Sequence, residues 1–269
     1  MSAQPAESAS HGILTSDSIP DPSDLEKELL LAAAAGDVPY IARLLQYDFD
    51  YNAVDSDGAT ACALATKSGS TEAVLALLQK GVNPNTADSS GNAPIHIACK
   101  ANNTVLVKEL VRHKAALNNA VPFVGTPALI ACKSQSLSTL KILLDAKANP
   151  NILTQGEGLL SVCAELDSLP MLEAVVAAKP DFEVVDSNGY TSLMIASQKG
   201  LTEIVRVLLS CKADATHISP EGSTAIYLAD FMGHADVVSL LEQFGAVSDL
   251  IACIHFNVVT NRLTLWLCA

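Results

Sequence analysis

The chain has 269 residues, of which 49% are apolar and 17% charged, so most of it can fold around an apolar core. Its net charge of −13 argues against binding to nucleic acid or to an anionic membrane surface, because both need a basic protein surface. No run of roughly 18 apolar residues could span a membrane. The seven cysteines show no zinc-type spacing, and we expect a protein of a reducing compartment, the cytoplasm or the nucleus.

The first 22 residues contain many Ser and Pro and no Lys or Arg, so they fit neither a secretory nor a transit peptide. We expect residues 1–22 to be a disordered tail. Residues 23–26, SDLE, have the pattern of a capping box, which predicts the start of the first helix. The folded array is therefore expected to begin at residue 23.

From there the sequence repeats with a period of 33 residues, shortened once to 32. An alanine recurs at this period, and a large aliphatic residue lies twelve positions after each alanine. The alanines are Ala32, Ala65, Ala98, Ala131, Ala164, Ala196 and Ala229. The aliphatic residues are Leu44, Leu77, Leu110, Leu143, Val176, Leu208 and Leu241. Such a period predicts stacked units, each of which buries its apolar face against its neighbours.

Each unit has the same order of local signals. A turn that contains glycine precedes a hydroxyl residue, which can cap a first helix of about two turns. A break then leads to a second helix with apolar residues at i, i+3 and i+4. The expected caps are Thr60, Thr126, Thr191 and Thr224. The units end in asparagine or a substitute, at Asn52, Asn85, Asn118, Asn151, Glu183 and Thr216.

This unit resembles the ankyrin repeat. The family motif T-P-L-H-x-A occurs as TACALA at 60–65, APIHIA at 93–98, TPALIA at 126–131, TSLMIA at 191–196 and TAIYLA at 224–229. The family ending G-A-D-x-N survives as GVNPN at 81–85 and KANPN at 147–151. Only His96 keeps the motif histidine, whose role in the family is structural. The resemblance implies an all-α ankyrin-repeat solenoid of helix-turn-helix units with hairpin tips, in seven repeats over residues 23–246.

Two regions depart from this pattern. Repeat five has lost most of the motif at residues 159–164, and with the degenerate turn of repeat four it marks a place where the array is expected to open under stress. Residues 247–269 are apolar, although a terminal repeat needs a polar outer face. Three interpretations of this segment stay open: a half-repeat that caps the array, a contact for another chain, or the frayed end of an incomplete gene product.

The sequence contains no set of groups that predicts catalysis. The six histidines are scattered over different repeats, and residues 156–161 are half of a dinucleotide motif without its third glycine. We expect no catalytic residue, no metal and no cofactor, and hence no enzyme. Cys62, Cys99, Cys132 and Cys163 follow the repeat, so they are expected to be buried and too far apart to pair, while Cys211 is expected to be an exposed thiol.

The resemblance implies that a partner would bind the concave face formed by turn tips and first helices. On this face Lys67, Lys100 and Lys133 recur at one period, with Lys199 one position away. They predict either a groove for an acidic segment of another protein or solvated lysines beside helix C-termini.

The same face carries apolar side chains. Phe123 lies in the turn VPFVG at 121–125, and Tyr190, Phe231 and Met232 are expected on the same side. These residues are candidate anchors for a partner, because aromatic residues dominate interface energies. The alternative is that Phe123 folds back onto its own repeat.

The sequence thus predicts a monomeric, non-catalytic interaction module that acts as an adaptor, scaffold or inhibitor. An alternative is the substrate-targeting part of a larger enzyme complex, such as a ligase or transferase. The resemblance also allows a chaperone of the proteasome-assembly type, which is similar in size. A further alternative is self-assembly through residues 247–269.

Overall fold

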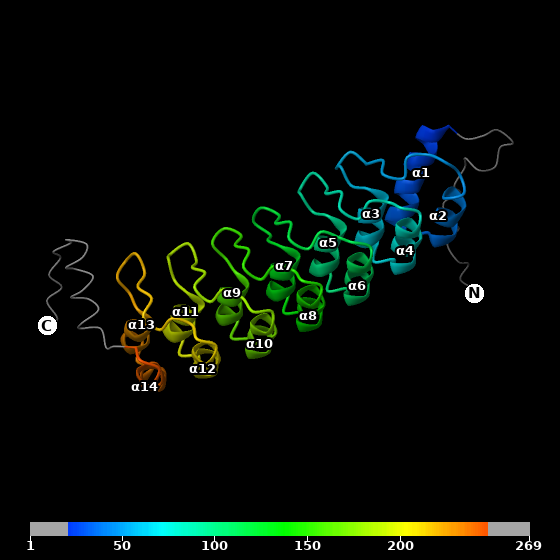
Figure 1. The fold of residues 1–269 in the computed structure, drawn as a ribbon. Coiled ribbons are helices and arrows are strands. Elements are labelled where there is room, and N and C mark those ends of the chain that lie inside the picture. Colours follow the sequence, from blue (N-terminus) through cyan, green and yellow to red (C-terminus); the bar gives the residue numbers. More distant parts are fainter. Residues whose placement is uncertain (1–20, 247–269) are drawn as a thin grey trace, which may run out of the picture. The chain divides into compact units, whose positions relative to one another are not determined.

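The computed structural model describes residues 21–246 (Figure 1). These residues contain fourteen helices: α1 (Pro22–Ala35), α2 (Val38–Leu44), α3 (Ala61–Ser68), α4 (Thr71–Gln79), α5 (Pro94–Lys100), α6 (Thr104–Arg112), α7 (Pro127–Lys133), α8 (Leu137–Asp145), α9 (Leu159–Glu165), α10 (Leu169–Ala177), α11 (Ser192–Gln198), α12 (Thr202–Ser210), α13 (Ala225–Phe231) and α14 (Ala235–Gln243). Extended pairing in the described part of the chain is limited to single bridges in hairpin tips, such as Val121 with Gly125. The fold is all-α, as predicted.

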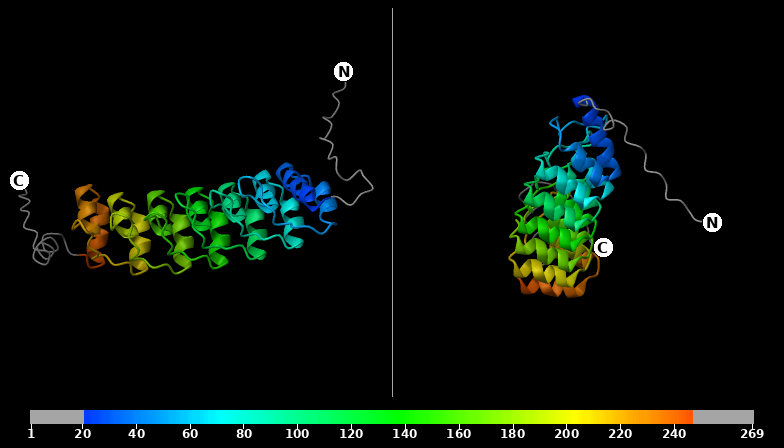
Figure 2. Two further views of the ribbon diagram at one scale, coloured as in Figure 1. Left: turned by 90° about the horizontal axis from the view of Figure 1, so that it is seen from above. Right: turned by 90° about the vertical axis from the view of Figure 1, so that its right-hand side faces the viewer.

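The chain divides into two compact units, residues 1–116 and 117–269. We call their described parts unit one, with α1 to α6, and unit two, with α7 to α14. Within each unit the first helices of successive repeats pack against one another, and the second helices form a parallel row behind them (Figure 2). In unit two, for example, α9 packs against α7 and α11, and α10 packs against α8 and α12.

The alanine column lies inside these rows. All seven alanines are 0% exposed, and six of the seven predicted aliphatic residues are equally buried. Val176 is the exception: it is half-buried, and the adjacent Val175 is fully buried instead. The loop between α8 and α9, residues 146–158, is one residue shorter than the loop between α10 and α11, residues 178–191, so Val175 holds the position in α10 that Leu143 holds in α8.

The predicted threonine caps are confirmed at Thr60, Thr126, Thr191 and Thr224, whose hydroxyls each accept the N–H three residues later. The prediction for the first helix is wrong. Asp21 is the N-cap and accepts the N–H of Ser23 at 2.9 Å, with Pro22 at the first helical position, which proline favours. Asp21 is thus the cap and Pro22 the first residue of α1, although both fall within the predicted disordered tail. The remaining predicted tail and the segment 247–269 lie outside the described residues.

Most of the residues that end a repeat form the same type of hydrogen bond. In five of the six, the side chain accepts a backbone N–H from the loop that follows the next helix pair, about thirty residues along the chain. The hydroxyl of Thr216 instead donates to Asp214. In unit one the bonds run from Asn83 to Asn52 at 2.8 Å and from Ala116 to Asn85 at 2.6 Å. In unit two they run from Asn149 to Asn118, from Asp181 to Asn151 and from Asp214 to Glu183 at 2.8–2.9 Å. These bonds join the loops that follow the second helices of successive repeats.

Candidate functional site

In unit one, two of the predicted lysines are exposed and unpaired. Lys67 lies in the last turn of α3, and Lys100 is the last residue of the neighbouring helix α5. Among the described residues neither ammonium group has a hydrogen bond or an ion pair. Each lies beside the free carbonyl groups of its helix C-terminus, where a cation is favoured by up to about 1 kcal/mol.

In unit two, the equivalent lysines are engaged with neighbouring repeats. Lys133, at the end of α7, forms an ion pair with Glu157 in the hairpin before α9. Lys199 follows α11 and donates a hydrogen bond to the backbone carbonyl of Glu165 at 2.8 Å. These two ammonium groups therefore link their own repeats, unlike those of Lys67 and Lys100.

Phe123 is the most exposed large apolar residue described. Its side chain is 82% exposed, which excludes the alternative that it folds back onto its repeat. The hairpin is closed by the N–H of Val121, which donates to the carbonyl of Gly125 at 3.0 Å. Phe123 has a φ of 63°, in the left-handed region that a bulky residue rarely adopts. The turn thus holds an aromatic ring in solvent on a strained backbone.

The other apolar candidates lie near α11 and α13. Tyr190 is only half-buried by its own hairpin, in which its N–H donates to Asp186 at 2.8 Å. Phe231 is 74% exposed and Met232 is 52% exposed at the end of α13. The ring of Tyr227 stacks on that of Phe231, with 5.9 Å between centroids, and is itself 41% exposed.

Tyr227 was not identified from the sequence. Its position in the repeat corresponds to Leu129, Ser161 and Met194, which are all buried and lie in helices against which the next first helix packs. No described helix follows α13 in its row, so the ring of Tyr227 stays exposed. The spacing of four residues between Tyr227 and Phe231 on one predicted helix was the signal that could have found it.

The cysteines are buried as predicted, but their predicted separation is wrong. Cys132 Sγ lies 3.5 Å from Cys163 Sγ, because Cys132 follows the column alanine of α7 and Cys163 precedes that of α9, so that the two face each other. Burial raises the pKa of Cys62 and of Cys99 to about 12, which disfavours their reactive thiolates. Cys211 is half-buried, less accessible than predicted.

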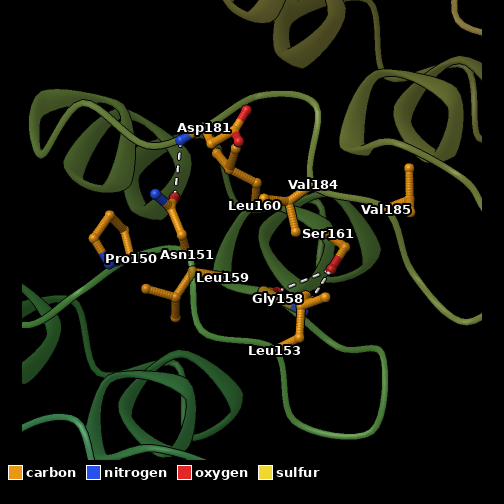
Figure 3. Close-up of a pocket in the computed structure, with 10 residues that line it drawn as sticks. All are labelled: Pro150, Asn151, Leu153, Gly158, Leu159, Leu160, Ser161, Asp181, Val184 and Val185. Atoms are coloured by element: carbon orange, nitrogen blue, oxygen red, sulfur yellow. Dashed lines mark hydrogen bonds between the residues drawn. The ribbon is translucent and has the colours of Figure 1, made fainter.

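Unit two also contains a small cavity beside repeat five (Figure 3). It has a volume of about 10 Å³ and is lined by residues on both sides of α9, among them Leu153, Ser161 and Val184. Ser161 bonds to the backbone of Gly158, and Asn151 accepts the N–H of Asp181. The volume suits about one water molecule, whereas ligand sites usually exceed about 300 Å³.

The buried histidine has a local role. The N–H of Ala93 donates to Nδ1 of His96 at 3.2 Å, so the ring accepts a bond at the start of α5, as the resemblance implies. Residues 21–246 contain no group of three or more side chains suited to hold a metal ion. None of the helices in this range is long and apolar enough to cross a membrane. The candidate site is thus the exposed surface of hairpin tips and first-helix ends.

Comparisons with known proteins agree with this architecture. A family model described as "Ankyrin repeats (3 copies)" matches residues 19–88, 78–154 and 160–249, so the chain belongs to the ankyrin-repeat family. The fold is that of an ankyrin-repeat solenoid, and such repeats generally serve as protein–protein interaction modules.

Two solved structures show the same fold. The ankyrin repeat domain of Bcl-3, a unique member of the IkappaB protein family, aligns with a TM-score of 0.72 at 22% identity, over 80% of this chain and 97% of that domain. The human ASB11 ankyrin repeat domain aligns with a TM-score of 0.64 at 20% identity, over 79% and 96% of the two chains. At these identities the likeness concerns the fold alone.

One curated relative is similar over a short stretch. The inactive serine/threonine-protein kinase TEX14 of Bos taurus is 40% identical over 63 residues. That stretch is 23% of this chain and 4% of the relative, so the chain spans a small part of that protein.

Proposed function

We propose that this chain is a non-catalytic binding module that holds a partner protein on its hairpin tips and first-helix ends, as an adaptor, scaffold or inhibitor. The observation that carries the proposal is Phe123, an aromatic ring that is 82% exposed on a left-handed backbone. Exposure leaves its apolar area in water and the backbone conformation adds strain, so the fold gains nothing from this ring. A partner that covers the ring would gain the free energy of burying its apolar surface.

Unit one suggests the charge of the partner. Lys67 and Lys100 are exposed, lie on neighbouring helices and have no acidic partner in the described residues, although the chain carries a net charge of −13. An acidic segment would find there two cations that are not neutralised by the protein itself. Exposed pairs contribute about 0.2–1 kcal/mol each, so these lysines would steer the segment more than anchor it.

A second candidate is that the module serves as the targeting part of a larger enzyme complex. The observation that favours it is the match to a short stretch of a much longer protein named as an inactive kinase. A co-purified chain that carries enzymatic activity would support this candidate. A chaperone of the proteasome-assembly type and a location in the cytoplasm or nucleus stay predictions.

The experiment is capture of partners with the wild-type chain and two variants. We expect the amount of captured partner to fall with Phe123→Ala, and with the double substitution Lys67→Glu and Lys100→Glu. Phe244→Ala is the control for the ring, since Phe244 is 48% exposed at the end of α14 in the second row. Lys80→Glu with Lys108→Glu is the control for charge, because both lysines are exposed in the second row of unit one, Lys80 directly after α4 and Lys108 on α6.

A partner that is lost from the Phe123 variant and kept by the Phe244 variant supports binding through the hairpin tips. Equal capture by all variants contradicts the proposal. Loss with both lysine pairs points to net charge and contradicts the role of Lys67 and Lys100. Circular dichroism of each variant, which should give the wild-type helix content, separates binding from folding.

A further inference from the structure

A group of three sulfur atoms joins repeats four and five in unit two. Cys132 Sγ, on α7, lies 3.5 Å from Cys163 Sγ on α9 and 3.9 Å from Met171 Sδ on α10. All three side chains are at most 2% exposed. The sulfur atoms of the two cysteines therefore touch each other inside the core, with no other side chain between them.

We propose that Cys132 and Cys163 form an oxidative modification site, at which a hydroperoxide converts the two thiols into a disulfide between α7 and α9. A disulfide has a sulfur–sulfur bond of about 2.05 Å, so the two atoms need to approach by roughly 1.5 Å. A shift of that size is available to side-chain rotation and a small movement of two short helices.

The reaction has two steps. One thiolate sulfur attacks the O–O bond of hydrogen peroxide, which gives a sulfenic acid and one water molecule once the released hydroxide takes up the thiol proton. The second thiolate attacks the sulfenic sulfur and expels its hydroxyl, which leaves as a second water molecule after protonation. Two thiols thus lose two electrons and two protons, and one peroxide is reduced to two waters.

Burial sets when this reaction can occur. The hydrogen bond between the Cys163 thiol and Cys132, together with the apolar surroundings, raises the pKa of Cys163, so its thiolate is scarce while the helices stay packed. Oxidation therefore requires α7 and α9 to separate briefly and admit the peroxide. Repeat five has the degenerate motif, and the loop before α9 is one residue short, which makes this contact a site for such opening.

The disulfide would hold α7 and α9 together at the contact that had opened. A bond between Cys132 and Cys163 closes a loop of about thirty residues, and such a loop typically stabilises the folded state by restricting the unfolded chain. The ion pair of Lys133 with Glu157 connects the same two repeats at the surface. In the oxidised protein α7 and α9 should therefore no longer separate, and the hairpin of Phe123, which precedes α7, should stay in place.

The test uses the full chain and hydrogen peroxide, slightly below the midpoint of thermal unfolding. After free thiols are blocked, digestion with trypsin at Lys133 and Lys147 leaves Cys132 and Cys163 in separate peptides, neither with another cysteine. We expect the cross-linked pair of peptides to appear with peroxide and to disappear with a reductant. The unfolding temperature should rise by about 5–10 °C in the oxidised form.

Variants make the assignment specific. Cys163→Ala should abolish both the cross-link and the rise in unfolding temperature. Cys99→Ala is the matched control, because Cys99 is a buried cysteine at the repeat position of Cys132, and it should leave both effects unchanged. Cys132 recovered only as a blocked free thiol, or linked to a cysteine other than Cys163, would overturn the proposal. Peptide mapping of the wild-type chain decides this even when a variant folds poorly.

Discussion

Glu183 accepts the backbone N–H of Asp214 through Oε1 at 2.9 Å, in the position that asparagine occupies between other repeats. In the preceding repeat the same bond runs from Asp181 to Asn151 at 2.8 Å. The longer glutamate side chain reaches the equivalent N–H at almost the same distance. The repeat ending thus requires a side-chain acceptor that reaches this N–H, and both asparagine and glutamate supply one.

This bond predicts the effect of substitutions at position 183. Glu183→Ala should lower the free energy of unfolding by about 1 kcal/mol, because the N–H of Asp214 loses its acceptor in the protein. Glu183→Gln should keep most of the stability, since its carbonyl oxygen can accept the same bond. Denaturation in urea measures both changes. Glu173→Ala, at an exposed position of α10, is the control and should change little. Equal stability of the alanine and glutamine variants would contradict this role for the bond.

Asp214 also predicts a dependence of stability on pH. The hydroxyl and the N–H of Thr216 both donate to Oδ1 of Asp214, which lowers its pKa below the usual value of 3.8. A lowered folded-state pKa gives stability that is present above pH 3.8 and is lost as the pH falls through the folded-state value. Asp214→Asn should therefore flatten the fall of unfolding free energy between about pH 4 and pH 2. Parallel curves for the variant and the wild type would contradict this contribution.

The sequence predicted the periodic parts of the fold because they depend on one repeat at a time. The alanine column, the threonine caps and the row of repeat endings each follow from local spacing and from the need to satisfy backbone groups. The start of α1 was misplaced because the pattern at residues 23–26 satisfies a capping box, while Asp21 and Pro22 provide an equally good start two residues earlier. Local signals alone did not choose between them.

Features that depend on two repeats were not predictable in the same way. The contact of Cys132 with Cys163 requires knowledge of which helix faces meet, and the shortened loop before α9 moved the buried position from Val176 to Val175. The bonds of Lys133 and Lys199 likewise reach into a neighbouring repeat. The exposure of Phe123 was left open because the sequence does not give the direction of a side chain at a turn tip.

Ser197 predicts a stabilising substitution. Its hydroxyl is buried in α11 and has no hydrogen-bond partner among the described residues, and a buried unsatisfied hydroxyl carries the cost of its lost hydration. Ser197→Ala should raise the free energy of unfolding by about 1 kcal/mol, with a further contribution from the higher helix propensity of alanine. Thermal denaturation measures the change. Ser210→Ala is the control, because that exposed hydroxyl donates to the carbonyl of Arg206. A loss of stability in Ser197→Ala would show that the hydroxyl has a partner, such as a bound water.

Substitutions of Phe123 separate the effect of its backbone conformation on stability from the effect of its ring on partner binding. With φ at 63°, glycine is favoured over any residue with a Cβ atom, so Phe123→Gly should be more stable than Phe123→Ala by about 1 kcal/mol. Both variants should lose the aromatic anchor and bind a captured partner about 30-fold more weakly, as expected for an anchor worth about 2 kcal/mol. Urea denaturation and a binding titration give the two quantities independently. Unfolding that becomes easier in the glycine variant than in the wild type would mean that the ring stabilises the hairpin, and its exposure would then have a structural reason. Wild-type stability or better, together with weaker binding, would show that the strained turn serves the partner.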